Sequence, residues 1–255
     1  MSRGAPVARR GPGAGAAGDG RPPGTLPPAL PWALAGGAVL AQVAYPLVHG
    51  VTREAVTVAS VLLWCAASLA HAALTRGARW AGALLAVTAG GGLLAEAVGV
   101  RTGVPFGRYT YAGTLGPQIG GVPLVVPLAW TMMAYPALAV GRRIARSPAA
   151  AALAGGLALA AWDLFLDPQM VDAGHWRWDQ DGPALNGIPV TNTLGWALVG
   201  VLMMAALSAP PRRPADDRLP YALYLWAFGS SLLANLAFFD RPGVALAGGL
   251  GMGVL

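Results

Sequence analysis

Seven apolar segments, each long enough to cross a lipid bilayer, recur along this chain and constrain its fold more than any other feature. They cover residues 31–48, 55–74, 80–100, 122–140, 149–166, 190–207 and 219–239. A transmembrane helix needs about 20 predominantly apolar residues. An eighth segment, 244–255, is rich in glycine and too short to span alone. The sequence therefore predicts an all-α fold, a polytopic transmembrane bundle of about seven to eight spans.

The composition agrees with a membrane protein and argues against a nucleic-acid-binding one. The chain is 55% hydrophobic and 11% charged, whereas soluble domains carry about 25% charged residues. The net charge of +6 comes with 17 basic residues, all arginine, and most of them lie between the apolar segments. No arginine-rich helix with interleaved aromatic residues is present, so we expect no nucleic-acid partner.

The distribution of arginine predicts the orientation of the bundle. Residues 1–28 are rich in Gly, Ala, Pro and Arg, and such a segment cannot bury a core, so we expect a disordered cytoplasmic tail followed by one transmembrane domain, 29–255. With the N-terminus in the cytoplasm, 12 of the 17 arginines fall on the cytoplasmic side, as the positive-inside rule requires. The loops 101–121 and 168–189 then lie together on the outer side.

Three of the 11 acidic residues lie inside or at the edge of apolar segments: Glu96, Asp163 and Asp167. A charged side chain at the bilayer centre costs roughly 2.5–3.5 kcal/mol on insertion scales, so such residues are functional candidates. Asp163 and Asp167 are four residues apart and share one helix face. In a low-dielectric pocket one of the two carboxyls is expected to keep its proton, which is the usual equipment for general acid–base catalysis.

Structural alternatives remain open for each of these acids. The span ends near Pro168, so Asp163 and Asp167 can be a solvated or arginine-paired couple at the membrane interface. Glu96 can form an ion pair with Arg101, with Arg108 or with another span. The aromatic residues of the outer loops can stabilise a cation through their ring faces, or they can form the aromatic belt common at membrane interfaces.

Familiar cofactor and nucleophile motifs are missing from the sequence. No Cys and His spacing suggests zinc, no serine or cysteine elbow suggests acyl transfer, and no phosphate-binding loop or dinucleotide fingerprint is present. We therefore expect no cofactor and no metal, with a metal bound by Glu and Asp side chains left open as an alternative. Asn192 opens the sixth apolar segment, where it either caps the helix or orients a carboxylate or a water molecule.

Long, irregular motifs between about residues 80 and 240 resemble those of the carotenoid hydratase family. They are Glu96-x-x-Gly99-Val100-x-Thr102-Gly103-x-Pro105-Phe106-Gly107-x-Tyr109-x-Tyr111, Leu115-Gly116-Pro117, Gly121-Val122-Pro123 leading to Trp130, Trp162-Asp163-x-x-x-Asp167-Pro168-x-Met170, Trp176-x-Trp178, and Gly187-Ile188-Pro189-x-x-Asn192-x-x-Gly195-Trp196. The chain departs from the family before Gly187, where Asn186 stands near a position at which an aromatic residue is expected.

The resemblance implies a multi-pass protein of the inner (plasma) membrane that hydrates a terminal isoprenoid double bond of a carotenoid. The implied partners are the carotenoid in the bilayer and other carotenoid biosynthetic enzymes. We expect Glu96 or Asp163 to act as the acid and Asp167 as the base. The residues expected to bind the substrate or stabilise a carbocation are Phe106, Tyr109, Tyr111, Trp130, Trp162, Trp176, Trp178 and Asn192.

Two other classes of function remain as alternatives. One is a small-solute or proton-coupled transporter with the acids as a relay, and the other is a scaffold for neighbouring carotenoid enzymes. A transporter is expected to show repeated halves with interrupted helices at matching positions. We expect no internal repeat from the sequence, and this expectation favours the enzyme.

Overall fold

The computed structural model describes residues 1, 26–179, 182–209 and 215–254. The predicted disordered tail, 1–28, falls almost entirely outside the described residues. The helices are α1 (Leu30–Ala44), α2 (Gly50–Arg76), α3 (Ala78–Leu85), α4 (Gly91–Thr102), α5 (Val125–Ile144), α6 (Pro148–Asp172), α7 (Val190–Ser208), α8 (Arg218–Ala237) and α9 (Pro242–Gly253). Short helical turns add η1 (Tyr45–Leu47), η2 (Ala86–Gly90) and η3 (Gly113–Leu115). The strands are β1 (Tyr109–Tyr111), β2 (Gln118–Ile119), β3 (Val122–Pro123), β4 (Trp176–Trp178), β5 (Ala184–Leu185) and β6 (Ile188–Pro189).

Within the described part of the chain, five helical segments are long and apolar enough to cross a membrane. They are Leu30–Leu47, Gly50–Arg76, Ala78–Thr102, Pro148–Asp172 and Val190–Ser208. Helices α5 and α8 have 20 residues each, long enough to span at about 1.5 Å per residue, but their Pro, Tyr, Trp and Arg residues lower the mean hydropathy. Helix α9, with 12 residues, is too short. The predicted all-α, polytopic membrane fold is confirmed.

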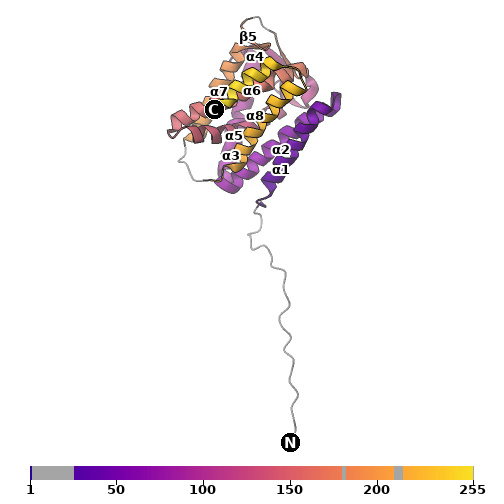
Figure 1. Ribbon diagram of the computed structural model, residues 1–255. Coiled ribbons are helices and arrows are strands. Elements are labelled where there is room, and N and C mark those ends of the chain that lie inside the picture. The colour runs from indigo at the N-terminus through magenta and orange to yellow at the C-terminus, as the bar shows by residue number, and fades with distance from the viewer. Residues whose placement is uncertain (2–25, 180–181, 210–214, 255) are drawn as a thin grey trace.

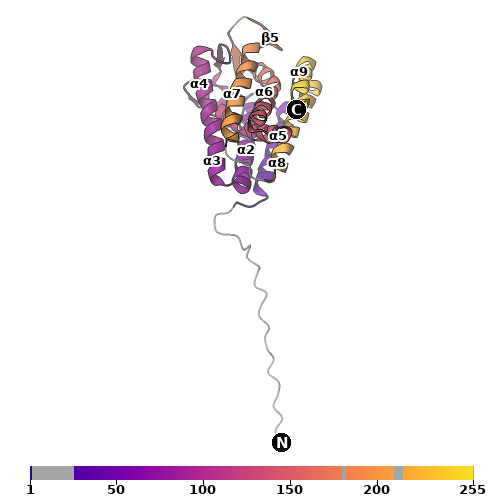
Figure 2. The ribbon, with the colours of Figure 1, turned by 90° about the vertical axis from the view of Figure 1, so that its left-hand side faces the viewer.

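Helix α6 is the centre of the bundle, packed between α5, α7 and α9 (Figures 1 and 2). Glycine makes this close packing possible, because small residues let helix backbones approach in a membrane. A Cβ atom added at Gly156 of α6 would lie 2.5 Å from the backbone nitrogen of Val201 on α7. The α6–α7 pair therefore has no room for a larger residue there.

The strands gather at one end of the bundle, which we call the loop end (Figures 1 and 2). Strand β1 pairs antiparallel with β4, so that Tyr109 lies opposite Trp178 and Tyr111 opposite Trp176. The hairpins β2–β3 and β5–β6 follow in sequence and lead directly into α5 and α7. The two long loops of the sequence thus meet in one place, as the arginine distribution predicts.

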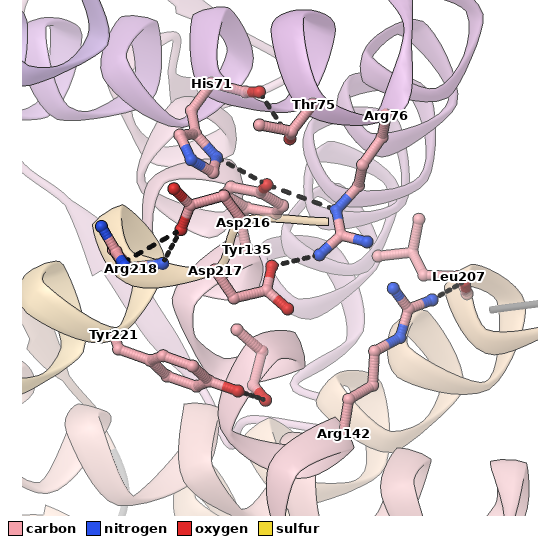
Figure 3. A network of polar contacts seen from close by, with 11 residues as sticks. His71, Thr75, Arg76, Tyr135, Arg142, Leu207, Asp216, Asp217, Arg218 and Tyr221 are labelled. Carbon is pink, nitrogen blue, oxygen red and sulfur yellow. Dashed lines mark hydrogen bonds and ion pairs between the residues drawn. The ribbon is translucent and has the colours of Figure 1, made fainter. Parts of the chain in front are cut away.

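The end of the bundle away from the strands is closed by polar side chains of α2, α5 and the start of α8 (Figure 3). The Tyr135 hydroxyl lies 2.9 Å from Nδ1 of His71 and accepts a hydrogen bond from Nε of Arg76 at 3.3 Å. Arg76 also forms an ion pair with Asp217. None of these residues lines the large cavity described below.

The expectation of no internal repeat is wrong. The segments Gly116-Pro117-Gln118-Ile119-Gly120-Gly121-Val122-Pro123 and Gly182-Pro183-Ala184-Leu185-Asn186-Gly187-Ile188-Pro189 match residue for residue in pattern. Each forms a two-residue hairpin whose central residues have positive φ, Gly120 and Gly121 in one and Asn186 and Gly187 in the other, as type I′ turns require. Asn186 is thus a turn residue.

The repeat includes the helices on both sides of each hairpin. The order helix, strand, hairpin, helix runs from α4 through β1, β2 and β3 to α5, and again from α6 through β4, β5 and β6 to α7. Corresponding residues Trp130 and Trp196 stack on each other, with ring centroids 3.9 Å apart and planes 12° apart. The fold therefore contains two similar halves that meet at this tryptophan pair.

Candidate active site

The first half of the repeat surrounds Glu96 with hydrogen-bond donors. Oε2 of Glu96 accepts from the hydroxyls of Tyr109 and Tyr111 at 2.5 and 2.8 Å, and Oε1 accepts from Nε1 of Trp130 at 3.0 Å. The residue is 4% exposed. Its partners are thus two phenols and an indole rather than the Arg101 or Arg108 of the ion-pair alternative. These three donors are neutral, so they supply hydrogen bonds to the Glu96 carboxylate but do not neutralise its negative charge.

Two glycines leave the space that these aromatic donors occupy. A Cβ atom at Gly92 would lie 2.8 Å from the Trp130 ring, and one at Gly99 would lie 2.7 Å from the Tyr109 hydroxyl. Both glycines lie on α4, on either side of Glu96. The absence of side chains at these two positions of α4 therefore leaves room for the Trp130 and Tyr109 rings beside the Glu96 carboxylate.

The β1–β4 pair positions side chains from both halves of the repeat. Nε1 of Trp176 donates to Oδ1 of Asp167 at 3.1 Å, while Nε1 of Trp178 donates to the carbonyl of Phe106 at 2.9 Å. Burial and the neighbouring charge of Glu96 hold the pKa of Tyr111 well above its usual range. The phenol of Tyr111 therefore keeps its proton and remains a donor.

The second half of the repeat holds a carboxyl pair. Nδ2 of Asn192 donates to Oδ2 of Asp163 at 2.8 Å and also to Oδ2 of Asp167. The two carboxyl groups are neighbours, because one amide nitrogen contacts both, and they are 1% and 3% exposed. The solvated or arginine-paired alternative does not describe this pair. The Asn192 side chain does not cap α7; it bridges the two acids.

One large cavity, of about 470 Å³, reaches both groups of acids. Glu96, Asp167 and Asn192 line it, whereas Asp163 does not. The remaining walls near the acids are aromatic: Phe106, Tyr109, Tyr111, Trp130, Trp162, Trp176, Trp178 and Trp196. The structure thus brings the predicted site residues together around one apolar cavity. Asp163 is the exception: it does not line the cavity itself but contacts Asn192, which does.

Trp196 and Trp64 are among the cavity residues that the sequence does not predict. Trp196 stacks on Trp130 and makes an edge contact with Trp162, with ring centroids 6.1 Å apart. Its signal was available, because it lies four residues after Asn192 and so on the same helix face. Trp64 of α2 also lines the cavity, and its indole nitrogen is buried without a partner among the described residues. Nothing in the local sequence marks Trp64.

The ionisable residues that the structure describes do not form a recognisable metal centre. Among the described residues, no group of three or more His, Cys, Asp and Glu side chains is placed to hold a metal ion. His175, in the loop between α6 and β4, has its Nδ1 2.8 Å from the Thr114 hydroxyl. Burial lowers the pKa of His175, which favours its neutral form. What the cavity offers chemically is therefore carboxyl groups, amide and indole donors, and ring faces.

Two comparisons with known proteins give a match. The model of a family described as carotenoid biosynthesis protein matches residues 55–254. Bisanhydrobacterioruberin hydratase of Haloarcula japonica is 37% identical over 111 residues, which are 41% of this chain and 37% of that protein. The match thus spans well under half of that relative's length. No solved structure matches the chain. Because the family model matches 200 of the 255 residues, from 55 to 254, the chain belongs to the carotenoid biosynthesis protein family.

Proposed function

We propose that this membrane protein is an enzyme that adds water to a terminal isoprenoid double bond of a carotenoid. The observation that carries the proposal is the pairing of two unlike acid groups at one aromatic, apolar cavity. Glu96 has three neutral donors, while Asp167 shares Asn192 with a second carboxyl group. Acid-catalysed hydration needs one group that gives a proton and another that takes one. The hydratase name of the Haloarcula relative supports the same reaction class.

The geometry favours Asp167 as the acid. Two adjacent ionised carboxyls in a desolvated site repel, so the Asp163–Asp167 pair is expected to hold a proton. Of the two, Asp167 lines the cavity and Asp163 does not. Asp167 is then the group that meets the substrate, and Asp163 is a positioning residue. This assignment differs from the expectation that Asp163 or Glu96 is the acid and Asp167 the base.

The same geometry favours Glu96 as the base. Its donors match an ionised carboxylate, which accepts hydrogen bonds and has none to give. In the proposed reaction Asp167 transfers its proton to the less substituted alkene carbon, and a tertiary carbocation forms at the other carbon. A water molecule bonds to the cation, and Glu96 takes the proton that the water releases. Proton exchange between the two acid groups and solvent then restores the starting state.

Ring faces and charge stabilise the cation in this scheme. Aromatic rings attract cations through their quadrupole, more strongly where water is excluded. Trp130, Trp162 and Trp196 form a continuous group of rings beside Glu96 and Asn192. The Glu96 carboxylate adds an attractive charge. The cavity is thus suited to a short-lived carbocation on an apolar substrate.

The direct test is expression of this chain in a bacterium that makes an acyclic carotenoid such as lycopene, with extracts read by mass spectrometry. We expect a product heavier by the mass of one water molecule per hydrated end. A strain carrying the empty vector is the control for spontaneous hydration. If the protein is in the membrane and no acyclic carotenoid gains water, the hydratase proposal is wrong.

The transporter alternative now has one observation in its favour. The two halves of the repeat place α4 and α6 in corresponding positions, and parallel repeats occur in transporters. The second expected feature, interrupted helices at matching positions, is not found, because α6 is continuous from Pro148 to Asp172 while its counterpart contains the π-helical turn η2. The expression test separates these functions, since a transporter leaves the mass of the carotenoid unchanged.

We further propose that the protein lies in the plasma (inner) membrane with its N-terminus in the cytoplasm, where it meets its carotenoid substrate and other carotenoid enzymes. Gln118 at the loop end and Arg146 between α5 and α6 are both exposed. With Cys65 replaced by Ala, a cysteine at position 118 is expected to react with a membrane-impermeant maleimide in intact spheroplasts. A cysteine at 146 is expected to react only after lysis. The reverse pattern would contradict this orientation.

A further inference from the structure

The cavity extends from the acids to a second region between α1, α2 and α8. Lining residues there include Gln42 and Val43 of α1, Ser60 of α2, and Leu225 and Gly229 of α8. The helices that form this region are distant in sequence from the stacked Trp130 and Trp196, yet they line the same cavity. The site therefore has an aromatic end that holds the acids and another end bounded by α1 and α8.

The α1–α8 end of the cavity reaches the surface of the bundle. Val43, Leu225 and Leu233 line the cavity and are nevertheless 50%, 66% and 60% exposed. Val43 lies in the candidate span Leu30–Leu47, and Leu225 and Leu233 lie on α8, whose 20 residues are long enough to cross a bilayer. With both helices in the membrane, the opening faces lipid. At the other end, Trp130, Trp196 and Phe106 are almost fully buried. The cavity is thus closed at the acids and open towards lipid.

Helices α1 and α8 border this opening with few contacts between them, although α1 packs closely on α2 (Figure 1). Nε1 of Trp226 donates to Oε1 of Gln42 at 2.6 Å. Near the loop end, the rings of Tyr45 and Phe239 meet edge to face with centroids 6.1 Å apart. Among the described residues, one side-chain hydrogen bond and one ring contact therefore join the two sides of the opening.

The size of the cavity limits what it can hold. A volume of about 470 Å³ suits a ligand of drug-like size, since such pockets measure about 300–1,000 Å³. An extended acyclic carotenoid is roughly as long as the hydrocarbon core is thick, about 30 Å. The end group of such a molecule fits the cavity, while the whole polyene does not.

Resting on the proposed hydratase function, we propose that the α1–α8 opening is the lateral site through which the carotenoid binds. The terminal double bond lies at Asp167 and Glu96, and the polyene passes between α1 and α8 into the bilayer. The protein then recognises one end group and leaves the rest of the molecule in lipid. A substrate with two reactive ends is hydrated in two separate binding events.

Gly229 offers a way to block the opening without disturbing the acids. It lines the cavity on α8, and a Cβ atom added there meets nothing within 4 Å. The series Gly229→Ala, Gly229→Leu and Gly229→Phe fills the opening in steps. Gly36 of α1 is a matched control, because it is also an exposed helical glycine with open space at its Cβ, but it does not line the cavity.

The measurement compares a long and a short substrate in the same membranes. The long one is the acyclic carotenoid that the wild type hydrates, and the short one is myrcene, which has the same terminal double bond and gives myrcenol. We expect the ratio of carotenoid to myrcene turnover to fall with side-chain size at position 229, by about tenfold or more for Phe. Gly36→Phe is expected to keep the wild-type ratio.

The outcomes separate this inference from the function on which it rests. An unchanged ratio across the Gly229 series, or a wild type that hydrates the carotenoid but not myrcene, would overturn the lateral binding site while leaving the hydratase intact. A wild type that hydrates neither compound would overturn both. Because a ratio within one membrane sample cancels the amount of folded protein, reduced expression of the Phe variant does not hide the result, and the Ala and Leu variants extend the series.

Discussion

Replacement of Asp167 by Asn is expected to abolish carotenoid hydration while leaving the protein in the membrane. Asn has nearly the size of Asp, and its oxygen can still accept the hydrogen bond that Trp176 now gives to Asp167. Its amide protons, however, are not acidic enough to be transferred to an alkene. General acid catalysis contributes about 10²–10⁴-fold to a rate, so product formation is expected to fall by at least 100-fold. The measurement is hydrated carotenoid formed per amount of membrane-inserted protein.

Asp172 is the matched control for this substitution. It lies at the end of the same helix, α6, where it is exposed and forms an ion pair with Arg241. Asp172→Asn removes a carboxylate of the same type away from the cavity, and it is expected to change the rate by less than about twofold. Wild-type turnover by Asp167→Asn would end the assignment of Asp167 as the acid, whatever the effect of Asp172→Asn.

The transmembrane character of the fold could be predicted from sequence because it depends on local properties. Apolar length decides whether a segment can span a bilayer, and a carboxylate inside such a segment is conspicuous because it is costly. Both arguments need only the residues of a single segment and no knowledge of its neighbours in the fold. They were enough to identify Glu96, Asp163 and Asp167, and the arginine distribution was enough to bring the two outer loops to the same end.

The contacts between the loops could not be predicted in the same way. The pairing of β1 with β4 joins Tyr111 to Trp176, and no local pattern in either three-residue strand specifies its partner. The same pairing decides that phenols reach Glu96 while an indole reaches Asp167. Whether Asn192 caps a helix or bridges two carboxyls also depends on α6 lying beside α7. These features are tertiary, so periodicity does not reveal them.

The internal repeat is, by contrast, visible in the sequence once the two hairpin segments are aligned. The Gly-Pro and Gly-x-Pro steps around Gly121 and Gly187 recur in the same order, but the residues between the repeats differ in chemistry. Glu96 corresponds in position to Asp163, yet Asp163 has a second carboxyl four residues on and Glu96 does not. The two halves thus share one order of helices and strands but carry different acidic residues. A nearly symmetric bundle can in this way hold both an acid and a base.

Replacement of Glu96 by Gln is expected to stop hydration at a different step. In the proposed reaction the variant still forms the carbocation, because Asp167 is intact, but it lacks the base that takes the proton from water. General base catalysis is worth about 10²–10⁴-fold, so hydrated product is expected to fall by at least 100-fold. The cation then returns to an alkene by losing a proton. In deuterated water, the recovered carotenoid of this variant is expected to gain deuterium at its terminal double bond.

Deuterium exchange therefore distinguishes the two carboxyls where the loss of product does not. Asp167→Asn is expected to show neither hydration nor exchange, because without an acid no cation forms. Tyr111→Phe removes one hydrogen-bond donor to Glu96 but leaves both the proton donor and the base in place. Because a hydrogen bond to a charged group is worth about 1.5–3 kcal/mol, this variant is expected to hydrate the carotenoid about tenfold more slowly. Exchange in Asp167→Asn but not in Glu96→Gln would reverse the two roles. Loss of exchange in both variants would mean that Glu96 is needed before the cation forms, and that it is not simply the base that receives the proton of the attacking water.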